Sequence, residues 1–327
     1  MEMSHMRRTN FTGFDWANLP KLAAAAMVAM MCLPSGLMAQ QPGQKTFSSA
    51  EQASKAIVTA AESNDEKTML EILGPDGKRI VSSGDDAEDA ESRANFAKRY
   101  REMHRLVKEP DGTTILYIGA HNWPWPIPLM NKANVWYFDT VAGEKEILYR
   151  RIGRNEVSAI HICQELVTAQ KEYAAQHNGE YAQKIFSDEG QQNGLYWKAA
   201  NSQPQSPIGP LVASAVAAGY ANSQVGAATP YRGYYFHILE REGKGSAAKS
   251  YVVNGKMTAG FAFVAYPAEY RSSGVMAFIV DQDGVVYEKD LGKKTDVFAK
   301  EMKVYDPSAG WQKAEEQQEE AANQPAK

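Results

Sequence analysis

The sequence predicts an α+β fold of two modules, each with helices followed by an antiparallel sheet. Two observations point to this fold. Residues 44–152 begin with apolar side chains at helical spacing and end in β-branched and aromatic runs, and residues 153–305 repeat that order. Helices that precede strands, rather than alternating with them, are typical of α+β proteins with antiparallel sheets. The length of 327 residues allows two modest domains or one large one.

In the first module, three helices are expected to precede three strands. The first helix begins at Ser48, where Ser48 and Glu51 match a capping box. The second helix ends at Gly74, a residue that commonly stops helices. The predicted elements are helices from 48 onward, at 64–73 and at 87–108, then strands at 114–118, 135–138 and 147–152.

The second module is expected to begin with one long helix, because apolar side chains recur at steps of three and four between residues 156 and 176. A short apolar helix at 211–218 follows, and then strands at 234–239, 260–266, 275–280 and 285–288. Residues 282–284, Gln-Asp-Gly, indicate a tight hairpin between the last two strands. Residues 306–327 are poor in large apolar side chains and are expected to form a solvated tail.

The first 39 residues are predicted to be a cleaved signal peptide. Arg7 and Arg8 precede an uncharged apolar run at 22–33, which is shorter than the roughly 20 residues that span a bilayer but fits a secretory signal. Ala39 offers a small residue before a cut. Cleavage would make the protein periplasmic or secreted, with no membrane span and with Cys163 as its one cysteine, expected to be buried. The alternative is an uncleaved single anchor.

Composition and charge exclude several classes of protein. Hydrophobic residues make up 44% of the chain and charged residues 23%, which excludes a wholly disordered chain and a multi-pass membrane protein. The formal net charge is −4, so no net positive field would attract the phosphates of a nucleic acid. We therefore expect no nucleic acid among the partners.

A set of distinctive segments spans nearly all of the predicted mature chain. They include residues 47–53 (FSSAEQA), 123–129 (WPWPIPL), 136–140 (WYFDT), 150–156 (RRIGRNE), 206–212 (SPIGPLV), 260–267 (GFAFVAYP) and 286–292 (VYEKDLG). Together they resemble the bacterial family known as domain of unknown function 2950. The resemblance implies an exported protein of Gram-negative bacteria and assigns no activity.

The second module alone also looks like the globular head of type II secretion pseudopilins. The likeness consists of one long helix, then Asn178-Gly-Glu-Tyr181, then antiparallel strands. Pseudopilins begin with a very apolar membrane helix, whereas residues 150–156 are charged here. If the two are related, this module has lost the part that polymerises, so the likeness is an analogy of fold.

Trp123 and Trp125 are the first candidate binding residues. Prolines alternate with them from residue 124 to residue 128, which forbids a helix or a central strand. Exposed, the two indoles would form a stiff aromatic ledge for a partner or a sugar. Buried, they would close the sheet of the first module, and we favour burial because large aromatic side chains contribute much core area.

Arg150, Arg151, Arg154 and Asn155 form the densest basic run and are the second group of candidates. Guanidinium groups could hold the carboxylate or phosphate of a small anionic ligand. The alternative, which we favour, is that they join the two modules by pairing with Asp139, Glu144 or Glu146, since arginine forks fix orientation.

The sequence carries none of the common catalytic or metal-binding motifs. Gly-x-Ser-x-Gly, His-Glu-x-x-His, Walker and dinucleotide patterns do not occur, and the histidines lack ligand spacing. We expect no catalytic residue, metal or cofactor, and a binding or envelope-assembly role with an envelope protein or small anionic ligand as partner. The alternative is a periplasmic hydrolase whose site assembles in space, with Asp85, His104 and His121 as its parts.

Overall fold

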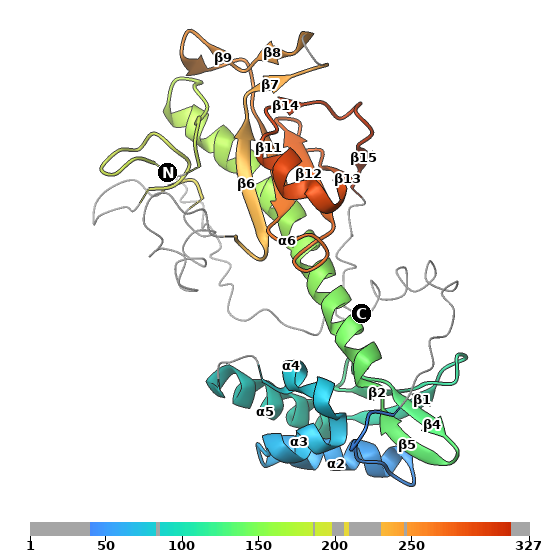
Figure 1. Ribbon diagram of the computed structural model, residues 1–327. Coiled ribbons are helices and arrows are strands. Elements are labelled where there is room, and N and C mark those ends of the chain that lie inside the picture. The colour runs from blue at the N-terminus through green and yellow to red at the C-terminus, as the bar shows by residue number, and fades with distance from the viewer. Residues whose placement is uncertain are drawn as a thin grey trace, which may run out of the picture. The chain divides into compact units, whose positions relative to one another are not determined.

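The computed structural model describes residues 40–82, 86–185, 187–197, 206–208, 230–244 and 247–314. Its helices and strands are labelled in Figure 1. The chain divides into two compact units, and the division falls between Tyr149 and Arg150. The fold is α+β with helices before antiparallel strands, as predicted. The predicted leader at 1–39 and the short helix at 211–218 lie outside the described residues.

The helices of the first unit match the prediction only in part: the first two lie close to their predicted positions, the last ends six residues before the predicted residue 108, and a short helix at 78–81 was not predicted. They are α2 (Ala50–Glu62), α3 (Glu66–Leu73), α4 (Lys78–Val81) and α5 (Asp86–Glu102), with a 3-10 turn at Pro75–Gly77. The cap of α2 is Ser49, whose side chain accepts from the Gln52 amide, one residue later than the predicted Ser48. Helix α3 confirms its prediction, with Asp65 as cap and Gly74 as stop.

The sheet of the first unit contains one strand that was predicted as helix. Its strands are β1 (His104–Lys108), β2 (Thr114–Ile118), β3 (Trp123–Pro124), β4 (Leu129–Lys132) and β5 (Val135–Phe138), in the order β1-β2-β4-β5 with β3 beside β2. The predictions for β2 and β5 are confirmed. Strand β1 continues the charged composition of α5, but it pairs along its whole length with β2, and this pairing ends the helix at Glu102.

Helix α6 (Thr140–Gln176) replaces the strand that was predicted at 147–152. Asp139 caps it by accepting from the Ala142 amide at 3.0 Å. Gly143 suggested a turn because glycine costs about 1 kcal/mol in a helix. The structure instead requires glycine there, since a Cβ atom would lie 2.6 Å from Cγ1 of buried Ile127. The predicted start of the helix at 156 was therefore too late by about four turns.

The second unit is built on a five-stranded antiparallel sheet with the order β15-β13-β12-β11-β6 (Figure 1). Its strands are β6 (Tyr234–Leu239), β11 (Ala262–Pro267), β12 (Met276–Asp281), β13 (Tyr287–Asp290) and β15 (Gln312–Lys313). The four predicted strands and the hairpin are confirmed. Smaller elements are β7 (Arg241–Glu242), β8 (Lys249–Ser250), β9 (Val252–Val253), β10 (Lys256–Met257), β14 (Val304–Tyr305), α8 (Thr295–Lys300) and a 3-10 turn at Gly292–Lys294.

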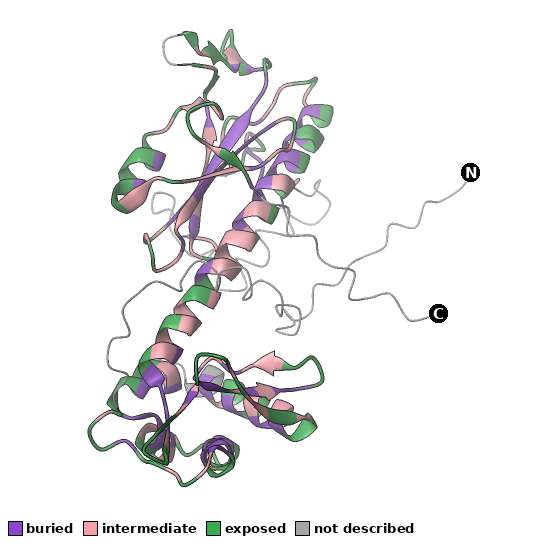
Figure 2. Cartoon of the chain, turned by 90° about the vertical axis from the view of Figure 1, so that its right-hand side faces the viewer, coloured by how far each residue is buried: buried purple, intermediate pink, exposed green. Residues whose placement is uncertain are grey.

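The core of the second unit lies between α6 and this sheet. Ile162, Cys163 and Leu166 of α6 are buried in one cluster with Phe263 and Phe278 of the central strands. Figure 2 colours these strands as buried. Side chains on β11 are buried on both faces because helix α8 also packs against this strand. This packing fixes the position of α6 on the sheet, and it therefore also fixes the positions of the polar residues of α6 relative to the sheet.

The C-terminal segment differs from the predicted tail at 306–327. Strand β15 pairs with β13, so that Lys313 lies opposite Tyr287. Ala314 is buried and its amide donates to Val286 O at 2.9 Å. The segment orders through backbone pairing rather than through large apolar side chains, so its composition did not reveal it. Residues 315–327 lie outside the described residues.

Candidate functional site

The predicted basic run lies on helix α6, directly after the division between the two units at Tyr149 and Arg150. Arg150 and Arg154 are four residues apart and therefore share one face of the helix. A fourth arginine, Arg232, lies in the turn before β6 and was missed by the sequence analysis. We call Arg150, Arg151, Arg154 and Arg232 the arginine cluster. Burial, and then the charges of the other three members, hold the pKa of Arg154 below its ordinary value. The four guanidinium groups thus share one electrostatic environment.

A glycine brings Arg232 to α6. Gly233 has a φ of +76°, and a Cβ atom there would lie 2.8 Å from Nδ2 of Asn155 and 2.8 Å from Cβ of Ser273. Asn155 in turn donates from Nδ2 to Ser273 O at 2.8 Å. The turn before β6 and the loop before β12 therefore both pack against Asn155 of α6. In the sequence, the residue that marks this contact is Gly233. Glycine is needed there because the backbone lies close to Asn155 and Ser273, and this proximity becomes evident only in the fold.

The loop between β11 and β12 supplies polar groups beside the cluster. Nη2 of Arg151 lies 3.5 Å from Oγ of Ser272, at the long limit of a hydrogen bond. Arg271 is exposed, has a φ of 62°, and donates its amide to Gly274 O at 2.8 Å. The loop is closed by Ser273, whose Oγ accepts from the Glu269 amide at 2.9 Å. Serine hydroxyls and a fifth guanidinium thus lie on the same loop that Asn155 holds.

Glu156 holds α6 to the sheet directly after the cluster. Its Oε1 accepts from the amides of Val275 at 2.8 Å and Met276 at 3.0 Å. Burial raises the pKa of Glu156, the two hydrogen bonds oppose that shift, and Asp290 adds to it. Nearby, the buried hydroxyl of Tyr234 donates to Met276 O at 2.8 Å. Glu156 therefore engages the backbone of the sheet through Oε1 and anchors the helix that carries the arginines.

Two of the acidic partners predicted for the arginines have other roles. Asp139 caps α6. Glu144 forms an ion pair with Arg79 of α4, with 2.7 Å between Nε and Oε1. Both interactions lie within the first unit. The interpretation that these carboxylates join the modules through the arginines is therefore not supported for Asp139 or Glu144.

The two tryptophans lie against the core of the first unit. Trp125 is only 9% exposed, stacks on Phe96 with ring centroids 5.2 Å apart, and meets Phe138 edge-on at 5.2 Å. Trp123, on β3, is half-buried and packs against the same cluster. The favoured reading, burial, holds for Trp125. An exposed ledge of both indoles is excluded, because one of its two rings is enclosed by other aromatic side chains.

The residues proposed for a hydrolase do not form a catalytic arrangement in the described part of the chain. His104 is exposed, stacks on Tyr100 at 3.8 Å, and its Nδ1 lies 2.9 Å from Tyr100 O. His121 is exposed in a turn, and Asp85 lies outside the described residues. Within the residues described, no group of three or more His, Cys, Asp or Glu side chains is arranged to hold a metal ion.

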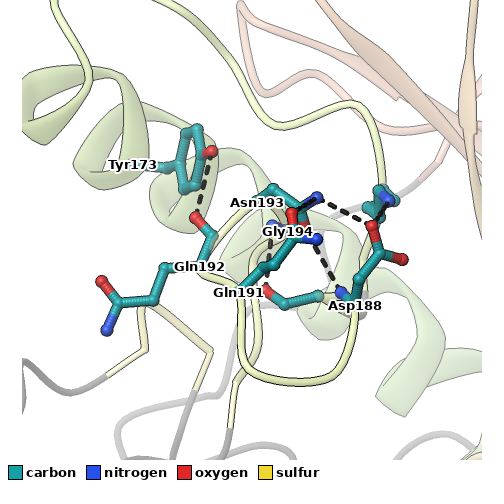
Figure 3. Close-up of polar contacts among 8 residues, drawn as sticks. Tyr173, Asp188, Gln191, Gln192, Asn193 and Gly194 are labelled. Atoms are coloured by element: carbon teal, nitrogen blue, oxygen red, sulfur yellow. Dashed lines mark hydrogen bonds and ion pairs between the residues drawn. The ribbon is translucent and has the colours of Figure 1, made fainter.

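The loop after α6 contains a network of polar side chains around Asp188 and Asn193 (Figure 3). The carboxylate of Asp188 accepts from Nζ of Lys184 at 2.6 Å and from Nδ2 of Asn193 at 2.8 Å. The Asp188 amide donates back to Oδ1 of Asn193 at 3.0 Å. These hydrogen bonds lower the pKa of Asp188. The polar groups bind one another, so this network closes the loop and is not a candidate ligand site.

Two cavities lie away from the candidate residues. One of about 590 Å³ in the first unit is lined by residues that include Pro42, Leu70 and Pro75. Another of about 170 Å³ in the second unit is lined by residues that include Ile160, Asp283 and Ala314. Neither lining includes a member of the arginine cluster or a tryptophan. Within the arginine cluster, Arg151 and Arg232 are exposed, and Arg150 and Arg154 are half-buried.

Comparisons with known proteins give a family and no further relative. No described helix is both long and apolar enough to span a bilayer. Searches of curated proteins and of solved structures gave no match. The model of one family, described as "Protein of unknown function (DUF2950)", matches residues 44–314, which include both units and every member of the arginine cluster. The chain therefore belongs to the DUF2950 family.

Proposed function

We propose that this protein is exported to the periplasm and acts there as a non-catalytic binding module, whose arginine cluster holds an anionic group of an envelope component. One observation carries the proposal: half-buried Arg154 of α6 lies close enough to Arg150, Arg151 and Arg232 that their positive charges lower its pKa. Guanidinium groups bind carboxylates and phosphates through paired hydrogen bonds. A bound anion would offset the repulsion among the four positive charges.

The export part of the proposal has separate support. Arg7 and Arg8 followed by the apolar run at 22–33 match a secretory signal. The family match begins at residue 44, beyond the expected cut after Ala39. A role in envelope assembly is supported by the element order of the second unit, a long helix followed by antiparallel strands as in pseudopilin heads. This likeness concerns element order alone.

The proposal is tested by measuring anion binding to purified protein by isothermal titration calorimetry. Inorganic phosphate and citrate serve as probes, one for each class of anion. We expect binding that weakens at high salt, and a loss of about tenfold or more in affinity for Arg154→Met and for Arg232→Met, because a charge-assisted hydrogen bond contributes about 1.5–3 kcal/mol. Methionine keeps much of the apolar stem and removes the charge.

Arg79→Met is the matched control, because Arg79 is an exposed arginine whose ion pair lies in the first unit. It should bind both probes as the wild type does. The proposal is wrong if the wild type binds neither probe. It is equally wrong if the three variants bind with the same affinity, since the anion would then be held elsewhere.

A further inference from the structure

Helix α8 presents two adjacent apolar side chains to solvent. Val297 is 46% exposed and Phe298 is 55% exposed, which makes Phe298 the most exposed large apolar side chain in the described part of the chain. On the opposite side of the helix, Thr295 and Ala299 are buried, where α8 packs against β11. That packing turns Val297 and Phe298 outward. A side chain more than half exposed protrudes from the surface and does not line a groove.

Lysines surround this apolar pair. Lys293 and Lys294 lie in the 3-10 turn that leads directly into α8, immediately before the helix that carries Val297 and Phe298. Lys300 and Lys303 follow, and all four lysines are exposed. Lys303 is paired, with 3.4 Å between its Nζ and Oε1 of Glu240. The other three lysines outnumber the two acidic residues of this stretch, Asp296 and Glu301, although the whole chain is acidic. The stretch is thus locally basic and apolar together.

We propose that this basic–apolar patch, formed by Lys293, Lys294, Val297, Phe298 and Lys300, docks on the surface of an anionic lipid bilayer. Lysines at the headgroup level bind anionic lipids, and their apolar stems lie along the interface. Protruding Phe298 and Val297 reach the boundary between headgroups and acyl chains. A bilayer admits a protruding side chain anywhere on its surface, whereas a folded partner needs a matching pocket. This inference does not depend on the arginine cluster.

The contributions have a predictable size. A lysine near an anionic membrane strengthens binding about fivefold. Removing Lys293 and Lys294 together should therefore weaken binding roughly twentyfold. Removing the phenyl ring of Phe298 should weaken it about tenfold, because partial insertion buries only part of its apolar surface.

Vesicle co-sedimentation of the full chain, as purified from cells, tests the proposal. One set of vesicles contains equal parts phosphatidylglycerol and phosphatidylcholine, and the other contains phosphatidylcholine alone. The readout is the affinity of each variant for each set of vesicles, compared with that of the wild type. The variants are Lys293→Ser/Lys294→Ser and Phe298→Ser. Their matched controls are Lys244→Ser/Lys249→Ser and Val253→Ser, which alter equally exposed residues of the same unit.

We expect the wild type and both controls to prefer anionic vesicles at low salt. Lys293→Ser/Lys294→Ser should lose most of that preference, and Phe298→Ser should bind anionic vesicles about tenfold more weakly than the wild type. Circular dichroism should be unchanged, because the altered side chains are exposed. Equal binding to both vesicle sets overturns the proposal, and so does binding that the patch variants leave unaltered. Wild-type protein that stays in solution with anionic vesicles also overturns it and would point to an acidic protein on this surface instead.

Discussion

At the scale of single residues, Glu156 shows how one carboxylate can fix a helix on a sheet. Its Oε1 accepts two amides at the start of β12, and burial raises its pKa above the ordinary 4.5. The folded state therefore holds the proton of Glu156 more tightly than the unfolded chain does. The stability that this proton contributes is present below about pH 4.5 and is lost as the pH rises through the higher pKa of the folded state.

Glu156→Gln should remove this pH dependence while keeping the hydrogen bonds, because an amide oxygen accepts from the same two amides. Relative to wild type, the glutamine variant should gain in free energy of unfolding as the pH rises from about 4.5 toward neutrality. Glu156→Ala should lose about 2 kcal/mol, because two amides lose their acceptor. Urea denaturation at a series of pH values measures both effects. A glutamine variant that loses stability relative to wild type over that range would contradict the expectation.

Cys163 is predicted to be inert in the folded protein. It is fully buried on α6, and burial raises its pKa to about 12, so the reactive thiolate is scarce at neutral pH. Ellman's reagent should leave this thiol unmodified in native protein and modify it completely after denaturation in guanidinium chloride. Rapid modification of Cys163 under native conditions, located by peptide mass mapping, would disprove its burial.

At the scale of elements, α6 contains two glycines with opposite requirements. Gly143 lies against Ile127, where an added Cβ atom would be 2.6 Å from Cγ1 and 3.0 Å from Cα. Gly153, ten residues later, has no atom within 4 Å of that position. A glycine-to-alanine substitution at each of the two positions therefore distinguishes the effect of side-chain packing on stability from the effect of helix propensity.

Gly143→Ala should destabilise the protein by about 2 kcal/mol, because buried Ile127 cannot move away without disturbing the core. Gly153→Ala should stabilise it by about 0.5–1 kcal/mol, because alanine loses less backbone entropy in a helix. Denaturation followed by circular dichroism gives both values. If both variants shift the free energy of unfolding in the same direction, the packing assigned to Gly143 is incorrect.

Helix α6 also shows what sequence patterns could and could not predict. Strands β2, β6, β11 and β12 were predictable because their side chains are β-branched or aromatic and their ends carry turn residues. The first part of α6 was not predictable, since Gly143 favours a turn and the large apolar side chains of Ile147, Tyr149 and Ile152 favour a strand. The helical conformation of that segment is compatible with the close contact between Gly143 and Ile127, and this contact cannot be predicted before the fold is known.

The candidate site was predictable only in part, for the same reason. Three of its arginines are adjacent on the chain, so their density in the sequence selected them. Arg232 comes to them from 78 positions away because Gly233 fits against Asn155. The alternative that both tryptophans are exposed is excluded because Trp125 packs against Phe96 and Phe138, which are also distant in sequence.

At the scale of the whole molecule, the chain has a negative net charge but contains two groups of basic residues. The net charge is −4, yet the arginine cluster and the lysines around α8 are local concentrations of positive charge. Each unit has a hydrophobic core of its own, and the proposed anion site and the proposed lipid surface both belong to the second unit. Both proposed partners are anionic, so both require that the protein reach a compartment where envelope components are present.

Export is therefore the prediction on which the cellular role depends. In a Gram-negative host, the protein recovered from the periplasmic fraction should begin at Gln40 by intact mass, because signal peptidase cuts after a small residue such as Ala39. Ala25→Asp/Val28→Asp should leave uncleaved protein in the cytoplasm, since two charges interrupt the apolar run at 22–33. Asn10→Asp/Thr12→Asp adds the same charges before that run and should still be cleaved. Recovery of full-length wild-type protein from the cytosol would refute export and, with it, the periplasmic role.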